Sequence, residues 1–200
     1  MVDTVIRVDD RPRLRDRERT RRALLDAALA EFSEKGFAGA RVGAIAARAG
    51  VNKQLISYYF GGKQGLRDAL VAEWLEAEAE FARPELTLGE LVGAYVRSSV
   101  EHRAISRVFV RESVEDAGDD EGGIGEEEVA LLRRRQEAGE LPADLDPAFV
   151  LLALQGAASA GLVFPGDVRR LTGLDPGSEA FAERYAEQLA RLLAHLGRAT

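Results

Sequence analysis

Residues 41–63 of the chain read RVGAIAARAGVNKQLISYYFGGK. Two short helices are expected here, at about 43–49 and 52–60, with Gly50 between them and Gly61-Gly62 after the second. Gly50 stands where a tight turn needs a positive φ, and the small Ala46 stands where the two helices would touch. This pattern predicts two helices that cross, with one apolar side hidden: Ile45, Ala49, Val51, Ile56 and Tyr59.

The second helix of this pair keeps hydrogen-bonding side chains on its other side. Asn52 is suited to cap its N-terminus. Amide, hydroxyl and ammonium groups of this kind bind base edges and phosphates when a helix enters the major groove. The pattern therefore indicates a helix-turn-helix whose outward residues read DNA: Asn52, Lys53, Gln54, Ser57 and Tyr58.

The charge of the chain is unevenly distributed along its 200 residues. Residues 1–63 carry 13 Lys and Arg against 8 Asp and Glu, whereas residues 64–200 carry 14 against 26, which together give the net charge of −7. A basic segment joined to an acidic remainder is typical of a module for polyanions fused to another domain. Chance clustering of surface charge would give the same numbers.

Composition excludes several other classes of protein. There is no cysteine, which rules out disulfide scaffolds, thiolate zinc sites and cysteine nucleophiles. There are only two histidines, which does not favour a histidine-rich metal site. No cofactor is expected. No metal site is expected either: residues 117–128 resemble a calcium-binding loop, but Ala117 stands at its first position, where a ligand oxygen is needed. No stretch is apolar enough to span a membrane, and the charged N-terminus does not resemble an export signal, so we expect a cytoplasmic protein.

The rest of the chain follows a helical period throughout. Further helices are expected near 16–36, 63–83, 87–102, 104–115, 126–138, 147–163 and 178–196, with an acidic loop at about 115–128. Thr87 with Glu90 forms a capping-box pattern, and Asp146-Pro147 is typical of a helix start. The helix at 147–163 is apolar almost all round, which predicts burial on several sides. The fold class is all-α with about nine helices.

The segment around the crossing helices resembles the DNA-binding signature of the TetR (tetracycline repressor-like) family of bacterial transcription regulators, over about residues 20–70. The shared features are Phe32 with Gly36-Phe37, the pair Ile45-Ala46, the turn Ala49-Gly50-Val51 and the ending Tyr59-Phe60-Gly61-Gly62-Lys63. The resemblance implies an N-terminal three-helix DNA-binding domain with a helix-turn-helix at 16–63, preceded by a flexible basic arm at 1–15. It also implies a helical domain for ligand binding and dimerisation at 64–200.

The resemblance also implies roles for individual residues. Lys53, Gln54, Ser57 and Tyr58 would face the major groove, whereas Tyr59 and Lys63 would hold phosphates. Ala40-Arg41 stand where the family usually has a hydroxyl residue, so the helix cap is lost although Arg41 can still neutralise a phosphate. The arginine-rich arm has two open interpretations, insertion into the minor groove or a disordered solubilising tail.

A dimer is expected because one recognition helix reads only a few base pairs, and two must meet successive major grooves. The candidate interface lies on the helices at 147–163 and 178–196, although both could instead be core of one subunit. Its residues are Phe149, Leu152, Gly156, Ser159, Phe181, Tyr185, Leu189, Leu192 and Leu196.

A pocket for an unknown small-molecule effector is expected in the same domain, with aromatic walls and a few orienting polar groups. Aromatic residues at helical spacing are more often core than pocket. The candidate residues are Trp74, Phe81, Tyr95, His102, Phe109, Arg111 and Gln155.

The combined expectation is a homodimeric, ligand-responsive regulator, a repressor of a palindromic operator that a small molecule releases. It is not expected to be an enzyme, because no catalytic constellation is found. The alternative is an all-α binding protein or enzyme with a vestigial helix-turn-helix.

Overall fold

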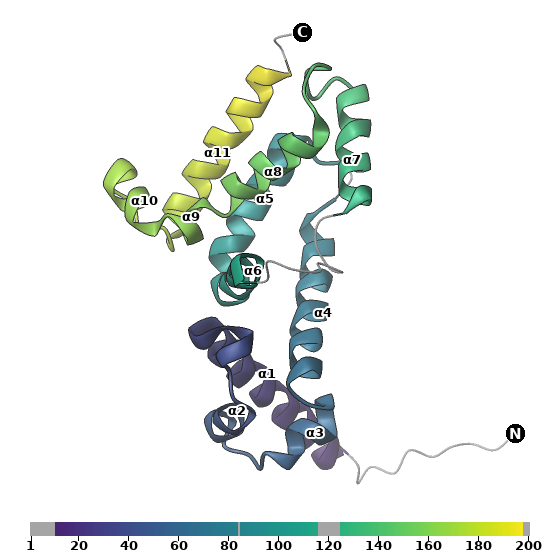
Figure 1. Cartoon of the computed structure of the whole chain (residues 1–200), viewed down its shortest axis with the longest axis vertical. Coiled ribbons are helices and arrows are strands. Elements are labelled where there is room, and N and C mark those ends of the chain that lie inside the picture. The colour runs from purple at the N-terminus through teal and green to yellow at the C-terminus, as the bar shows by residue number, and fades with distance from the viewer. Residues whose placement is uncertain (1–10, 84, 116–124, 198–200) are drawn as a thin grey trace, which may run out of the picture. The chain divides into compact units, whose positions relative to one another are not determined.

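The computed structural model describes residues 11–83, 85–115 and 125–197 of the chain, and these form eleven helices and no strand. The predicted all-α class is therefore confirmed (Figure 1). The helices are α1 (Arg11–Gly39), α2 (Val42–Ala49), α3 (Gln54–Phe60), α4 (Lys63–Phe81), α5 (Leu88–Glu101), α6 (Arg103–Glu115), α7 (Glu126–Glu137), α8 (Pro147–Ala158), α9 (Ala160–Val163), α10 (Pro165–Thr172) and α11 (Glu179–Leu196).

The chain separates into two compact units, Met1–Leu75 and Glu76–Thr200, with the division inside α4. The first unit holds α1, α2, α3 and most of α4. Its core consists of side chains with almost no exposed surface, contributed by all four helices: Leu24, Leu25, Phe32, Ile45, Ile56 and Leu66. The four helices therefore share one apolar centre, which fixes the direction in which α3 presents its outer side.

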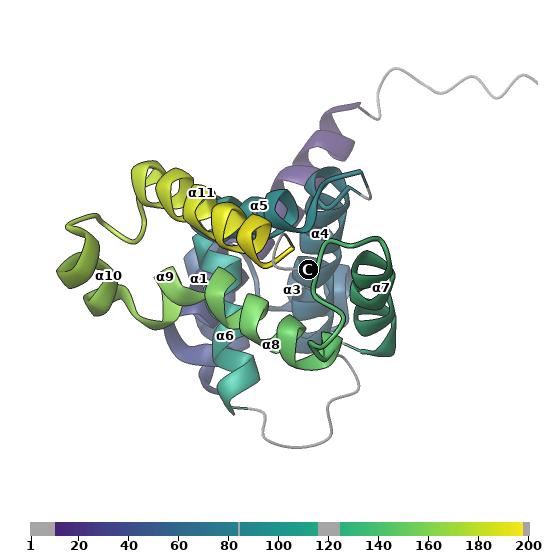
Figure 2. The ribbon, with the colours of Figure 1, turned by 90° about the horizontal axis from the view of Figure 1, so that it is seen from above.

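The second unit is built on α5 and α11, which lie side by side (Figure 2). Their contact is close because small residues face each other. A Cβ added at Gly89 would lie 2.9 Å from the Cα of Ala190, and one at Gly93 would lie 3.2 Å from the Cβ of Ala186. The surrounding core is aliphatic: Leu88, Val92, Val96, Leu132, Leu141, Ala182, Leu189 and Leu193.

Two of the predicted helix starts are confirmed by their hydrogen bonds. The Thr87 hydroxyl accepts from the N–H of Glu90 at 3.3 Å, and the Glu90 carboxylate accepts from the N–H of Thr87 at 2.9 Å. The carboxylate of Asp146 accepts from the N–H of Ala148 at 2.9 Å, with Pro147 in the first helical position.

The helices differ from the sequence expectation at three places. The helix predicted at 147–163 is divided at Ser159 into α8 and α9, and α10 was not predicted, so the described residues form eleven helices where about nine were expected. The first helix begins at Arg11, five residues before the predicted start near Asp16, so residues 11–15 are helical and not part of a flexible arm. Residues 1–10 of that arm and residues 116–124 of the acidic loop lie outside the described part.

The prediction that the helix at 147–163 is buried on several sides was wrong for this single chain. No residue of α8 is buried, and the side chains of Phe149 and Leu152 are 72% and 64% exposed. Only one side of α8 packs on the core, through residues such as Val150, Leu151 and Leu154.

Candidate nucleic-acid interface

The turn between α2 and α3 has the geometry that the sequence predicts. Gly50 has φ 67° and ψ 29°, in the left-handed region, and the N–H of Val51 donates to the carbonyl of Ala46 at 3.0 Å. The side-chain oxygen of Asn52 accepts from the N–H of Gln54 at 2.8 Å, which satisfies a free donor at the start of α3. Gly61, with φ 72°, ends the helix.

The predicted outward residues of α3 are on the surface. Asn52, Lys53, Gln54, Ser57 and Tyr58 are all exposed, and the ring of Tyr58 is 65% exposed. On the opposite side Ile56 is fully buried, as is Ile45 of α2, whereas Ala49, Val51 and Tyr59 are half-buried. The segment thus separates an apolar inner side from a polar outer side across only seven helical residues.

The start of α2 is stabilised from α1, which the sequence did not reveal. Arg41 makes no side-chain cap, as expected, but its backbone N–H donates to the carboxylate of Glu31, which is 1% exposed. Lys35 Nζ donates to the same carboxylate at 2.6 Å, and an Arg48 nitrogen lies 3.7 Å from it. The hydrogen bond from Lys35, together with the Arg41 N–H and the charge of Arg48, lowers the pKa of Glu31 below its usual value.

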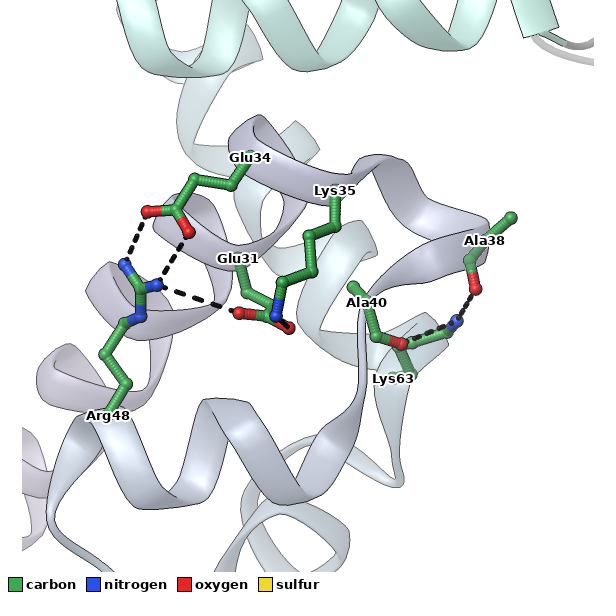
Figure 3. A network of polar contacts seen from close by, with 7 residues as sticks. All are labelled: Glu31, Glu34, Lys35, Ala38, Ala40, Arg48 and Lys63. Atoms are coloured by element: carbon green, nitrogen blue, oxygen red, sulfur yellow. Dashed lines mark hydrogen bonds and ion pairs between the residues drawn. The ribbon is translucent and has the colours of Figure 1, made fainter.

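Arg48 connects α2 to α1 through a second carboxylate (Figure 3). Its two terminal nitrogens donate to the two oxygens of Glu34 at 2.9 and 2.8 Å, a bidentate pair. This hydrogen bonding lowers the pKa of Glu34. The helix α2 is therefore fixed by charged side chains as well as by its apolar contacts.

Lys63, predicted as a phosphate contact, has backbone partners in this structure. Its Nζ donates to the carbonyls of Phe37 at 2.7 Å, Ala40 at 3.3 Å and Ala38 at 3.5 Å, and it lies 4.5 Å from the centre of the Phe37 ring. Figure 3 shows the ammonium beside the segment that joins α1 to α2. The phosphate role stays a prediction, and these contacts give Lys63 a structural role in addition.

The N-terminal part of α1 also contacts α3. Arg17 Nη2 donates to the hydroxyl of Tyr58 at 2.6 Å, and the Arg21 guanidinium lies 5.5 Å from the centre of the Phe60 ring. The rings of Tyr58 and Tyr59 meet edge to face at 5.0 Å. Contacts between residues 41 positions apart leave no local sequence pattern, which is why the sequence could not predict them.

This segment agrees with known proteins. The family model for bacterial regulatory proteins of the tetR family matches residues 24–70. Over 187 residues the chain is 27% identical to the HTH-type transcriptional regulator RutR of Escherichia coli, covering 86% of this chain and 88% of that protein. It is 31% identical to the HTH-type transcriptional repressor NicS of Pseudomonas putida, covering 64% of this chain and 66% of that protein. The chain belongs to the TetR family.

Solved structures agree with the TetR fold. The regulator SCO4942 of Streptomyces coelicolor has a TM-score of 0.68 at 23% identity, covering 88% of this chain and 97% of that one. The ketosteroid regulator KstR2 of Mycobacterium tuberculosis has a TM-score of 0.64 at 20% identity, covering 88% and 93%. The relatives named here are transcriptional regulators, not enzymes, and the chain is a TetR-family transcriptional regulator.

The candidate interface residues of this TetR-family chain fall into two groups. The first group is exposed or half-buried, and it lies on α8, on α11 and at the C-cap of α8: Phe149, Leu152, Gly156, Ser159, Tyr185, Leu192 and Leu196. Phe181 and Leu189 are instead 4% and 8% exposed, because they pack in the core of their own chain. These two residues are therefore unsuited to direct contact with a partner. They attach α11 to the core of its own chain.

The candidate pocket residues belong to both compact units, and two of their aromatic rings are in contact. Phe81 and Tyr95 meet edge to face at 5.2 Å, and the Tyr95 hydroxyl is hydrogen-bonded to Glu78. Burial of the Tyr95 side chain raises its pKa, and the hydrogen bond with Glu78 raises this pKa further. Phe109 and Arg111 are half-buried, and Trp74 belongs to the other compact unit.

Two polar pocket candidates have surface positions that do not suit an enclosed site. His102 stands exposed at the end of α5, where its N–H donates to the carbonyl of Ser98 at 2.8 Å. Gln155 is exposed on the outer side of α8.

Over the described ranges no helix is both long and apolar enough to cross a bilayer.

Proposed function

We propose that this chain is a ligand-responsive homodimeric repressor, which binds a palindromic operator and is released by a small molecule. The observation that carries the proposal is the outer side of α3, where five neighbouring polar residues are exposed while Ile56 behind them is fully buried. Lys53, Gln54, Ser57 and Tyr58 are proposed to contact base edges. Asn52 and Arg41 are proposed to contact the phosphates that fix the register.

A palindromic operator requires two such helices about 34–36 Å apart, which one subunit cannot supply. The exposed apolar side chains of α8 and α11 support self-association, because soluble proteins rarely leave groups such as Phe149 and Leu152 in water without a partner. The proposed dimer places the same helix pair of both subunits at one two-fold axis.

Release by a small molecule would follow from linkage. A ligand that prefers a conformation with wrongly spaced recognition helices weakens DNA binding by the factor by which DNA weakens ligand binding. The half-buried aromatic pair Phe81 and Tyr95, with Phe109 and Arg111, is our proposal for the ligand-contacting residues. A screen of lipophilic compounds by thermal shift tests this, since a ligand should raise the melting temperature and release the duplex.

DNA binding is tested with a duplex that the wild-type protein enriches from a randomised pool. Lys53→Ala and Tyr58→Ala should each weaken binding to this duplex by about 5- to 150-fold, corresponding to about 1–3 kcal/mol, with an unchanged melting temperature. Arg133→Ala is the matched control, because it removes one exposed positive charge from α7. Absence of any salt-sensitive specific complex under all conditions would contradict the proposal.

A further inference from the structure

The hydroxyl of Tyr58, on the outer side of the recognition helix, is held by a residue of another helix. Arg17 Nη2 lies 2.6 Å from it, and the guanidinium carbon lies 5.9 Å from the centre of the ring. A guanidinium has five N–H donors and no acceptor. The direction of this hydrogen bond is therefore fixed: Arg17 donates and the Tyr58 oxygen accepts.

This direction determines what the hydroxyl can do next. A phenol can normally donate or accept, so it tolerates either kind of group on a base edge. Arg17 occupies one acceptor position of the Tyr58 oxygen, which makes the hydroxyl a poorer acceptor for a second donor and leaves its hydrogen for donation. In the major groove guanine, adenine and thymine each offer an acceptor, whereas cytosine offers only its N4 amino donor.

The ring is also restrained against rotation. Tyr58 is 65% exposed, and its ring meets that of Tyr59 edge to face at 5.0 Å. An exposed tyrosine with one such contact would sample several rotamers. The bond from Arg17 connects the tip of the side chain to α1, so that the hydroxyl has a defined position before DNA is bound.

We propose that Arg17 is a specificity-determining residue: it makes Tyr58 a hydrogen-bond donor and so excludes cytosine at one position of each operator half-site. The inference rests on the proposed DNA-binding function. It assigns the kind of base to which the Tyr58 hydroxyl donates. Arg19 provides the contrast. It is a neighbouring arginine on α1 that pairs with Asp16 at 3.2 Å, and its side chain is 81% exposed.

The test uses the duplex that the wild-type protein enriches from a randomised pool, together with its single-base variants. Wild type should bind about tenfold more weakly when cytosine replaces the preferred base at one half-site position. Tyr58→Phe, which removes only the hydroxyl, should lose this discrimination at that position. Arg17→Ala should lose it at the same position, and the double variant should lose nothing further.

Arg19→Ala is the matched control, since it removes the same charge from the same helix. Arg17→Ala and Arg19→Ala should weaken binding to a scrambled duplex equally, and only Arg17→Ala should tolerate cytosine. Both should keep the wild-type melting temperature, because neither side chain is buried.

Each contrary outcome identifies what fails. If Arg17→Ala weakens all duplexes alike and lowers the salt dependence, Arg17 acts as a phosphate contact and the inference is overturned. It is also overturned if Tyr58→Phe keeps full discrimination, or if the effects of the two single variants simply add. If the wild-type protein enriches no duplex, the proposed function itself fails.

Discussion

Glu31 is the most deeply buried carboxylate among the described residues, at 1% exposure, and it connects three positively polarised groups. Glu31→Gln keeps the shape of the side chain but removes the charge that Lys35 and Arg48 contact. We expect a loss of about 1–3 kcal/mol in the free energy of unfolding at about pH 7, measured by urea denaturation. Glu137→Gln, an exposed carboxylate on α7, is the matched control and should change little.

The effect of Glu31→Gln should depend on pH. The pKa of Glu31 is lowered in the folded chain, so the unfolded chain binds this proton more readily. The stability that the carboxylate contributes is then complete above its unfolded pKa and is lost as the pH falls through the folded pKa. The difference between wild type and variant should shrink from about pH 7 towards about pH 3. A difference that is constant with pH would contradict the ionic role.

Lys63 allows a structural and a DNA-binding role to be separated. Lys63→Met keeps the side-chain stem and removes the donor for three carbonyls of residues 37, 38 and 40. We expect a loss of stability of about 1–3 kcal/mol from the missing hydrogen bonds. A slope of log affinity against log salt reduced by about one would show that the ammonium also neutralises a phosphate. Arg67→Met, from the same helix, controls for the removal of charge.

At the level of elements, the sequence predicted helices best where a cap or a glycine marks an end. The starts at Thr87 and Asp146 and the turn at Gly50 were found because their hydrogen-bonding patterns are local. The division at Ser159 could not be predicted, since apolar residues continue on both sides of it. The helix α10 was missed because its eight residues hold only two large apolar side chains, Val168 and Leu171, which are too few to establish a helical period in the sequence.

The same distinction between local and distant contacts applies to the candidate site. The exposure of Lys53, Gln54 and Tyr58 follows from the helical period with Ile56 on the inner side. Arg17 was not found, because its partner Tyr58 lies 41 residues away. Glu31 was not found because only Lys35 among its partners is local, whereas Arg41 and Arg48 become its neighbours through packing. These supporting residues belong to α1, so this helix contributes to the interface although it carries none of the predicted base contacts.

Gly65 permits the close approach of α4 to the end of α3. A Cβ at this position would lie 1.7 Å from the carbonyl oxygen of Phe60, which ends α3. Gly65→Ala should therefore displace the end of α3, with a loss of stability of about 1–3 kcal/mol and weaker operator binding. Gly43→Ala on α2 is the matched control: with open space around it, it should stabilise the chain by about 0.5–1 kcal/mol. Denaturation midpoints and duplex affinity measure both, and equal effects would contradict this account.

For the whole molecule, the question is what covers α8. This helix has twelve residues and none is buried, although its sequence is almost entirely apolar. Phe149 and Leu152 lie three residues apart on one side of α8, and Leu192 and Leu196 lie four apart on one side of α11. Side chains at these spacings share a helix face, so each helix presents a continuous apolar strip to water. Such strips are stable in a soluble protein when a second copy covers them.

A charge in this strip should disrupt the proposed dimer. We expect Phe149→Glu combined with Leu152→Glu to give a monomer by light scattering, with a wild-type helical circular dichroism spectrum, because neither side chain is in the core. Operator binding should fall with dimerisation, since a single recognition helix makes only half of the contacts. Val114→Glu on α6, 78% exposed, is the matched control for a new surface carboxylate and should remain dimeric and bind normally. If the α8 variant remains a dimer with full affinity, the subunits pair through another surface.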